Sequence, residues 1–421
     1  MAFVIAKARL WTYSSIWNGK DQLNYVSGRT SGEAADDQDS SLGDDTASST
    51  ESLRSSIVDY RLENGRTYHR YKDGKYNLPN DDEENERLDL QHHLFLLTFD
   101  NKLGLSPPNF SDSQAKRVLD LGTGTGIWAI DFGDEHPEAE IIGVDLSPIQ
   151  PSFVPPNVGF LIDDIDEEWD YSEPFDYIHS RMMNFSVQNW RDYLRNIYQN
   201  LTPGGYVELQ EIDVIMKSDD GTLTENKALH KWTKLLKEAA TKLGRPFEQT
   251  DAFKNIMAEV GFTDIIATRF KWPTNCWAKE KHYKQLGAWN NENTSMALES
   301  LTMAPFTRAH GWSSEEVDVF LVDVRKDLND PKIHAYWPIH WKLLVKLKKQ
   351  YRHRSTVTIS SYGLVQLVER DDSPIWLAWI NCSISSQGLG LRLDLNGRAL
   401  FARVPVWVWM AQTNGGQYMG T

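Results

Sequence analysis

Cysteine is scarce in this chain, because Cys276 and Cys382 are the only two among 421 residues. Two cysteines cannot build a disulfide framework or a cysteine-based zinc site, so we expect a reducing compartment, the cytoplasm or the nucleus. Long apolar runs are absent too, and no basic stretch precedes the short apolar start at residues 1–9. We therefore predict neither a membrane segment nor a signal peptide.

Positive charge is also in short supply, since the formal net charge is −15. A nucleic-acid surface needs a clustered basic footprint, so this balance argues against a nucleic-acid partner. It is compatible with a small-molecule substrate or a basic protein partner. We predict no metal site, because the adjacent His92 and His93 would point about 100° apart on a helix and could not chelate one ion together.

Composition divides the chain into four segments. Residues 1–56 contain a Gly, Ser, Asp and Glu stretch with scarcely any large apolar side chain, which predicts a disordered acidic tail. Residues 57–114 are aromatic and charged, and their apolar spacing near residue 90 predicts an N-terminal helical segment. Residues 115–341 form the predicted main domain, and residues 342–421 form a C-terminal extension.

The main domain alternates apolar strand-like runs with amphipathic helices. Strands are predicted over residues 117–121, 141–145, 157–162, 174–181, 206–212, 262–272 and 332–339. This alternation specifies an α/β fold with a doubly wound, mostly parallel sheet that is covered on both faces. The helices predicted between residues 276 and 329 are candidates for a lid over the substrate side.

The most specific pattern is a glycine-dense turn directly after the first of these strands. Gly122, Gly124 and Gly126 occupy every second position there. Glycines let the backbone turn sharply and leave no side chain between the loop and a ligand. Asp145 ends the next strand about twenty residues further on, where a carboxylate can bind a pair of ribose hydroxyls. The pattern predicts a site for an adenosine-containing cofactor.

The spacing of the glycines distinguishes between such cofactors. Dinucleotide sites use Gly-x-Gly-x-x-Gly, in which phosphate oxygens meet backbone N–H groups, and the present spacing is one residue tighter. It resembles motif I of the class I S-adenosylmethionine-dependent methyltransferases, which have a Rossmann-like fold and in which Asp120 would belong to the cofactor site. Asp164 and Ile165 follow the third strand, where these enzymes hold adenine. A nicotinamide or flavin enzyme is the alternative, and an ordinary tight turn would not explain both acidic strand ends.

A narrower resemblance is carried by short motifs that occur in one order between residues 56 and 338. They include Tyr60–Tyr71, Leu78–Asp81, Arg87–His92, Gly124–Asp131, Asp145–Pro151, Met303–Phe306 and Lys332–Tyr336. These motifs resemble those of fungal LaeA-type methyltransferases. The resemblance implies S-adenosyl-L-methionine as cofactor and a role in fungal secondary metabolism. Relatives end soon after the last strand, so residues 342–421 would be a non-homologous extension that forms no stable domain.

The extension allows a second interpretation. It begins with a basic run that contains Lys342, Lys346, Lys348 and Lys349. Such a run can also form a basic amphipathic helix that binds a membrane or a partner. We favour the interpretation without a membrane.

Candidates for acceptor chemistry lie at the ends of the fourth and fifth predicted strands. A sulfonium cofactor already carries an activated methyl group, so the protein mainly aligns the acceptor and excludes water. His179 is a candidate general base, and Arg181 is a candidate to hold a carboxylate. Glu208 and Glu211 are weaker candidates for a direct role.

We expect the chain to methylate a small-molecule intermediate. Aromatic residues in and beside the predicted lid favour an apolar acceptor pocket, namely Trp272, Trp277, Trp289 and Trp312. The alternative that the resemblance implies is a LaeA-like nuclear regulator. It would act as a protein methyltransferase or as the cofactor-binding subunit of a complex with a velvet-type protein.

Overall fold

The chain divides into two compact units, residues 1–348 and 349–421. The computed structural model describes residues 60–248 and 252–346, and beyond them only the backbone of short strands between residues 356 and 400. These strands are β10 (Thr356–Ile359), β11 (Val365–Val368), β12 (Ile375–Trp376), β13 (Ser383–Ser385), β14 (Gly388–Gly390), β15 (Leu393–Leu395) and β16 (Arg398–Leu400). The tail predicted over residues 1–56 lies outside the described residues, as does most of the predicted extension.

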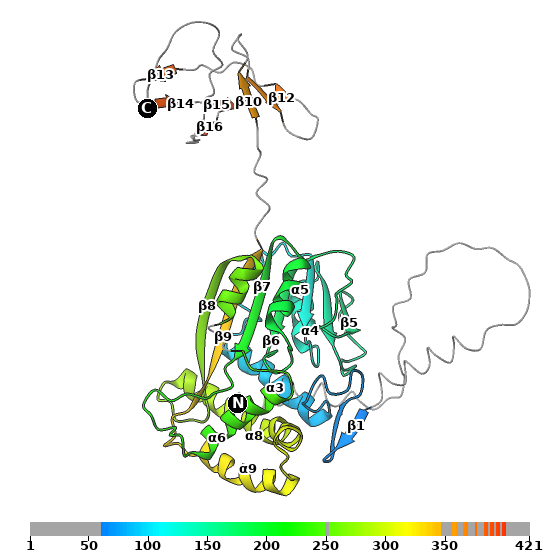
Figure 1. The fold of residues 1–421 in the computed structure, drawn as a ribbon, viewed down its shortest axis with the longest axis vertical. Helices are drawn as coiled ribbons and strands as arrows, with labels where there is room; N and C mark the ends of the chain where they lie inside the picture. Colours follow the sequence, from blue (N-terminus) through cyan, green and yellow to red (C-terminus); the bar gives the residue numbers. More distant parts are fainter. Residues whose placement is uncertain are drawn as a thin grey trace, which may run out of the picture. The chain divides into compact units, whose positions relative to one another are not determined.

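A seven-stranded sheet forms the centre of the first unit, in the order β5-β4-β3-β6-β7-β9-β8 (Figure 1). Its strands are β3 (Arg117–Leu121), β4 (Glu140–Asp145), β5 (Val158–Ile162), β6 (Phe175–Arg181), β7 (Leu201–Ile212), β8 (Phe262–Pro273) and β9 (Tyr336–Lys346). Neighbours from β5 through β7 run parallel, whereas β9 runs antiparallel to both β7 and β8. The predicted mostly parallel sheet is confirmed.

Helices cover both faces of this sheet. One face packs against α5 (Trp190–Gln199) and α7 (Phe253–Val260), for example through Ile178 of β6. The neighbouring residue Tyr177 points to the opposite face, which packs against α4 (Ile127–Glu135). Successive side chains of a strand alternate between faces, so a doubly covered strand is apolar at consecutive positions.

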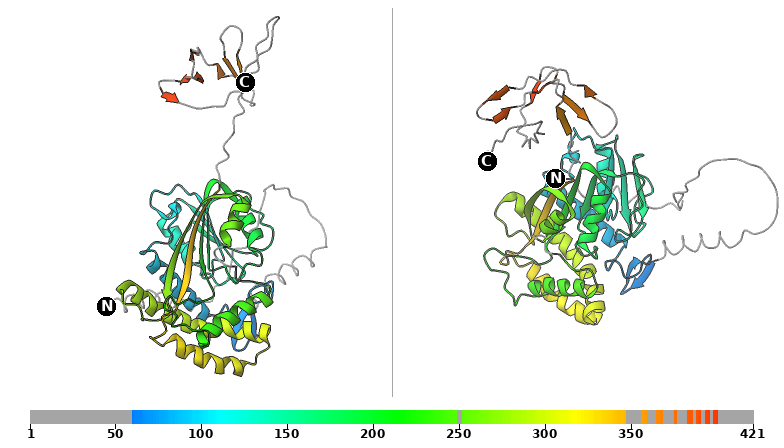
Figure 2. Two further views of the ribbon diagram at one scale, coloured as in Figure 1. Left: turned by 60° about the vertical axis from the view of Figure 1, so that its left-hand side comes forward. Right: turned by 45° about the horizontal axis from the view of Figure 1, so that its top comes forward.

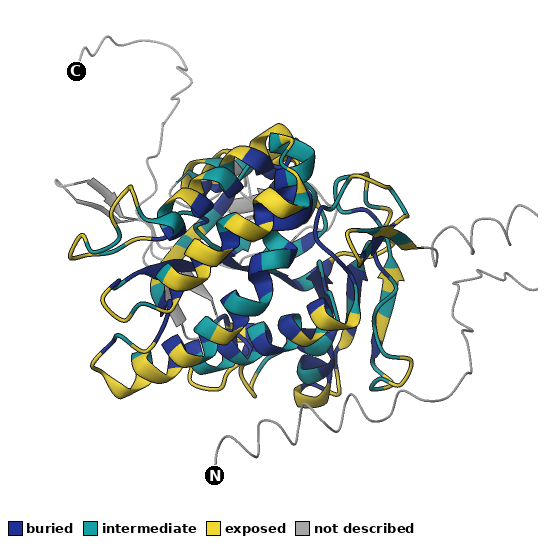
Figure 3. Ribbon diagram, turned by 90° about the horizontal axis from the view of Figure 1, so that it is seen from below, coloured by how far each residue is buried: buried dark blue, intermediate teal, exposed yellow. Residues whose placement is uncertain are grey.

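A layer of four helices gathers at one end of the sheet, as Figures 1 and 2 show. They are α3 (Asp82–Thr98), α6 (Ala228–Lys242), α8 (Lys281–His310) and α9 (Ser314–Leu328), and they share one hydrophobic core. Seen from below, the helices carry buried residues on one side and exposed residues on the other (Figure 3). Helices α8 and α9 occupy the region predicted to form a lid, and their action as a lid stays a prediction.

The segment predicted to be helical over residues 57–114 begins instead with a β-hairpin. Strand β1 (Tyr60–Glu63) pairs antiparallel with β2 (Arg66–His69). Asn64 and Gly65 between them have φ angles of 48° and 78°. Two consecutive residues with positive φ make the tight turn whose twist fits a hairpin, and Asn-Gly is its usual sequence signal. The helical prediction is therefore wrong for this part of the segment.

Helix α3 follows the hairpin and is joined to it through its cap. The Asp81 carboxylate accepts the backbone N–H of Glu84, which caps the helix. The same carboxylate pairs with the Arg66 guanidinium of β2, with Nε and Oδ2 2.6 Å apart. One short 3-10 helix, η1 (Pro107–Asn109), then leads to the sheet. Cap and ion pair together hold the hairpin against the start of α3.

Strand β9 runs past the domain boundary predicted at residue 341. It continues to Lys346 and pairs with β7 on one side and β8 on the other. Lys342 is buried in this strand, with its ammonium 4.5 Å from the centre of the Phe253 ring. The Lys346 ammonium donates to the carbonyls of Tyr198 and Leu201. Residues 342–346 thus belong to the sheet, and the alternative of an amphipathic helix is wrong for them.

Candidate active site

A cavity of about 150 Å³ lies where β3, β4, β5 and β6 end. The register brings these ends together, because Leu121 of β3 lies between Val144 of β4 and Ser180 of β6. Most of the predicted site residues line this cavity, namely Asp120, Gly122, Gly124, Asp145, Asp164, Ile165, His179 and Arg181. Gly126 does not line the cavity and instead packs against the Phe160 ring.

The glycine loop keeps its shape because two of its glycines have no room for a side chain. Gly122 and Gly126 have φ angles of 66° and 79°. A Cβ atom on Gly122 would lie 2.3 Å from the Met183 sulfur, and one on Gly126 would lie 2.3 Å from the Phe160 ring. Both the left-handed backbone and the packing therefore require glycine at these positions.

Gly124 faces the cavity instead. Its φ is 57°, and a Cβ atom there would meet only Leu88, at 3.4 Å. Its N–H donates to Asp145 Oδ2 at 2.8 Å, while the N–H of Ser147 donates to Oδ1 at 3.0 Å. The loop thus presents bare backbone to the cavity and orients the Asp145 carboxylate at its side.

The Asp145 carboxylate retains acceptor capacity for a ligand. Its oxygens accept the N–H groups of Gly124 and Ser147, with the N–H of Leu146 also directed at the carboxylate, and a carboxylate has about four acceptor sites. Burial raises the pKa of Asp145, and the backbone N–H groups of Ser147 and Gly124 oppose this rise. The arrangement suits a pair of hydroxyl donors.

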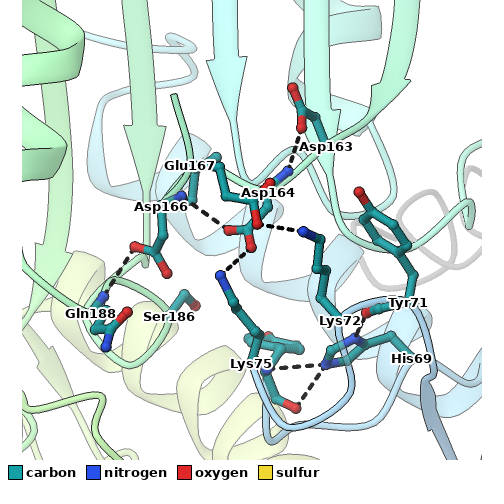
Figure 4. Close-up of polar contacts among 12 residues, drawn as sticks. His69, Tyr71, Lys72, Lys75, Asp163, Asp164, Asp166, Glu167, Ser186 and Gln188 are labelled. Carbon is teal, nitrogen blue, oxygen red and sulfur yellow. Dashed lines mark hydrogen bonds and ion pairs between the residues drawn. The ribbon is translucent and has the colours of Figure 1, made fainter. Parts of the chain in front are cut away.

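Asp164 lies on the far side of the cavity and is paired with a lysine. Its side chain is 2% exposed and its Oδ2 forms an ion pair with Lys75. Its Oδ1 accepts the N–H of Asp166 at 3.0 Å. Lys72 reaches Glu167 in the same way, so two ion pairs hold the loop after β2 over this end of the cavity (Figure 4). Binding of adenine by Asp164 stays a prediction.

Sequence reasoning missed the contribution of this N-terminal loop. Lys75, Tyr76 and Pro79 line the cavity. The loop is bent by His69, whose Nδ1 donates to the Tyr71 carbonyl at 2.7 Å and whose Nε2 accepts the Tyr76 N–H at 3.0 Å (Figure 4). No periodicity could have indicated this, because Lys75 and its partner carboxylate are 89 residues apart in the sequence.

Asp120 and His179 form a buried pair between β3 and β6. The His179 Nδ1 donates to Asp120 Oδ1 at 2.7 Å, and the Thr123 hydroxyl donates to Oδ2 at 2.6 Å. The imidazole stacks on Trp128 with ring centres 3.7 Å apart. Burial lowers the pKa of His179, and its Nε2 is buried without a hydrogen-bond partner among the described residues. The pair links two strands to the glycine loop, and a role for His179 as base stays a prediction.

The Arg181 guanidinium forms its hydrogen bonds with uncharged partners, while the carboxylates of Asp120 and Glu208 act on its charge without forming an ion pair. Its Nε donates to Gln210 Oε1 at 2.7 Å, its Nη1 to His92 Nδ1 at 3.0 Å, and its Nη2 to the Leu103 carbonyl at 3.3 Å. Its central carbon lies 4.4 Å from the centre of the Phe95 ring. Burial lowers the pKa of Arg181 to about 10. The guanidinium remains on the wall of the cavity.

The two weaker candidates, Glu208 and Glu211, are fully buried on β7 and do not line the cavity. The Glu208 carboxylate accepts hydrogen bonds from Leu105, Ser106, Asn109, Tyr177 and Gln210. Glu211 accepts the N–H groups of Met183 and Asn184, at 3.0 and 3.1 Å. Burial raises the pKa of Glu211 to about 8. Both carboxylates therefore hold loops in place instead of contacting a ligand.

The four tryptophans expected around an acceptor pocket do not line the cavity either. Trp272 is fully buried and donates to the Thr98 hydroxyl at 2.7 Å. Trp277 donates to a backbone carbonyl, while Trp289 and Trp312 pack against the core of the helical layer. Packing in a large apolar core accounts for these aromatics, and their assignment to an acceptor pocket stays a prediction.

The fold and the site together define a class I methyltransferase. A bare glycine loop follows β3, one carboxylate ends β4 and another follows β5, and the cavity lies at the carboxyl end of the parallel strands. Ligands bind at this edge in open α/β sheets. Among the described residues, no helix combines the length and the apolar character needed to span a bilayer.

Comparisons with known proteins specify the family. Residues 90–266 match the family model described as "Methyltransferase domain". Methyltransferase pytC of Aspergillus terreus is 41% identical over 292 residues, which cover 69% of this chain and 89% of that protein. Secondary metabolism regulator LAE1 of Cochliobolus heterostrophus is 38% identical over 283 residues, which cover 66% of this chain and 92% of that protein. Protein-methionine methyltransferase laeA of Emericella nidulans is 36% identical over 285 residues, which cover 67% of this chain and 75% of that protein. The chain belongs to the LaeA-type methyltransferases.

Proposed function

We propose that this chain uses S-adenosyl-L-methionine to methylate a small-molecule intermediate of fungal secondary metabolism. The observation that carries the proposal is the pairing of Gly124 with Asp145. A side-chain-free loop lies beside a carboxylate that its own N–H orients, and the two border one cavity. A cofactor with a nucleoside and no phosphate fits this arrangement, because the loop offers bare backbone and the carboxylate accepts hydroxyl donors.

The residues of the chain have defined tasks in this proposal. Asp145 binds the ribose hydroxyls, and Ile165 with Asp164 contacts the adenine. The bound cofactor supplies a methyl group that is already activated on a positively charged sulfur. The loop that carries Lys75 and Tyr76 covers the cavity, which excludes water and keeps the acceptor aligned.

Two further observations support a small acceptor. The cavity is bordered by the N-terminal loop, by α3 and by the loop after β6, so that a ligand is enclosed from several sides. Methyltransferase pytC of Aspergillus terreus and probable methyltransferase tdiE of Emericella nidulans are both relatives of this chain. Biosynthetic methylation of a metabolite in the cytoplasm is the function that we infer.

A regulatory function is the second candidate. Several relatives are named secondary metabolism regulators, and one is named a protein-methionine methyltransferase. For this chain, the regulatory candidate requires a protein acceptor, a velvet-type partner and a place in the nucleus. It uses the same cofactor site, so the two candidates differ in the acceptor, the partner and the compartment but not in the cofactor.

A deletion strain complemented with the wild type or with Asp145→Ala separates the two candidates. Loss of one methylated compound, restored only by the wild type, supports the biosynthetic function. Collapse of many pathways supports the regulator. The purified chain should bind S-adenosylhomocysteine in calorimetry, and a failure to bind it at millimolar concentration would refute both candidates. Glu140→Gln is the matched control, because Glu140 lies at the opposite end of the same strand as Asp145.

A further inference from the structure

The basic side chains that line the cavity differ in their partners. In the described part of the chain, they are Lys75, Arg181 and Arg245. Lys75 forms an ion pair with Asp164, and Arg245 forms one with Asp166. Among residues 60–248 and 252–346, no carboxylate forms an ion pair with the Arg181 guanidinium, and Asp120 and Glu208 act on its charge only without direct contact. Its charge is therefore available to a ligand in the cavity.

The hydrogen bonds of Arg181 also leave donors unused. A guanidinium has five N–H donors, and three of them meet Gln210, His92 and Leu103. The two that remain belong to Nη1 and Nη2, the pair of nitrogens that can bind a carboxylate side by side. A cation that is withdrawn from water without an ion-pair partner is costly for the fold, and a bound anion offsets this cost.

The position of Arg181 in the sheet indicates which part of a ligand it meets. Asp120 of β3 lies opposite His179 of β6, and Arg181 follows two residues later on the same face of the strand. With the nucleoside at the ends of β4 and β5, the other end of the ligand extends across β3 toward β6, because the sheet order is β5-β4-β3-β6. The carboxylate of Asp120 and the guanidinium of Arg181 both line this end.

We propose that Arg181 binds the carboxylate of the amino-acid end of S-adenosylmethionine. Opposite charges on Asp120 and Arg181 match the ammonium and the carboxylate of an α-amino acid. The inference rests on the proposed function, and it reassigns Arg181 from the methyl acceptor to the cofactor. Arg181 then determines specificity for the complete cofactor over nucleosides that lack the amino-acid carboxylate.

Calorimetry with two nucleosides tests this assignment on the full chain. S-adenosylhomocysteine carries the carboxylate, whereas decarboxylated S-adenosylhomocysteine keeps the amino group and lacks the carboxylate. The wild type should prefer the first by about 10- to 100-fold, the range expected for a charge-assisted pair. Arg181→Gln should lower the affinity for S-adenosylhomocysteine by a similar factor and should change the affinity for the decarboxylated ligand by less than about threefold. Arg181→Lys keeps the positive charge but lacks the paired N–H donors of a guanidinium, so its affinity for S-adenosylhomocysteine should lie between those of the wild type and Arg181→Gln.

Controls distinguish this inference from the proposed function. Arg117→Gln removes an arginine at the opposite end of β3 and should alter neither affinity. Thermal denaturation of each variant checks that the fold is intact. The inference is overturned if the wild type binds both nucleosides with equal affinity, or if Arg181→Gln lowers the affinity for both by the same factor. In either case the proposed function stands. A wild type that binds neither nucleoside overturns the proposed function as well.

Discussion

Replacing Asp145 with alanine removes the carboxylate that we assign to the ribose hydroxyls. The wild-type side chain already accepts N–H groups from Gly124 and Ser147, at 2.8 and 3.0 Å. The substitution therefore removes two predicted bonds to the ligand and two bonds that shape the loop. A hydrogen bond to a charged group contributes about 1.5–3 kcal/mol, so the loss should be at least about 3 kcal/mol. This corresponds to more than about 100-fold in Kd for S-adenosylhomocysteine.

Isothermal titration calorimetry with S-adenosylhomocysteine measures this loss directly. Asp145→Asn keeps the shape and one acceptor oxygen but directs an amide NH₂ toward a backbone N–H, so its affinity should lie between those of the wild type and the alanine variant. Glu140→Gln, at the exposed start of the same strand, should bind like the wild type. An alanine variant whose affinity stays within about threefold of the wild type would show that Asp145 does not contact the cofactor.

The affinity should also depend on pH in a defined direction. Burial raises the pKa of Asp145, and the ionised carboxylate is the form that accepts two hydroxyls. Affinity for S-adenosylhomocysteine should therefore be constant above the raised pKa and should fall below it. The fall should begin at a higher pH than for an exposed aspartate, and it should be absent in Asp145→Asn. A wild-type affinity that does not change from neutral pH down to the onset of acid unfolding would contradict this reasoning.

Two further substitutions test the packing around the site. Gly126→Ala forces a Cβ atom against the Phe160 ring at a φ of 79°, so it should lower the free energy of unfolding by about 2 kcal/mol or more in denaturant titrations. Gly159 has open space around it, so Gly159→Ala should change the free energy of unfolding by less than about 0.5 kcal/mol. Equal effects of the two would refute the argument from packing. Burial raises the pKa of Glu211 to about 8, above its value in the unfolded chain, so its contribution to stability should be present below about pH 4.5 and be lost as the pH rises through about 8. Glu211→Gln should remove this decline, which amounts to about 2 kcal/mol between pH 6 and pH 8. An unchanged pH profile of the variant would contradict the assignment.

Much of the fold could be predicted from local patterns. The strands near residues 117–121, 141–145 and 157–162 agree with β3, β4 and β5 to within about one residue. The β-hairpin was missed even though Asn64-Gly65 is its usual signal, because the aromatic and charged flanks do not alternate clearly. The boundary at residue 341 was placed too early because the last strand was predicted to end at residue 339, whereas β9 continues to Lys346 and buries Lys342.

The candidate site also has one part that the sequence could predict and another that it could not. By itself, the sequence determined the glycine loop, the carboxylates after the second and third strands and their order, because backbone geometry and strand period constrain residues close together in the chain. Only the tertiary structure decided that Lys75 pairs with Asp164, that Glu208 and Glu211 support loops, and that Arg181 forms its hydrogen bonds with uncharged partners. These outcomes depend on side chains that meet across many tens of residues. No local pattern encodes such meetings, since they arise only when the helices pack on the sheet.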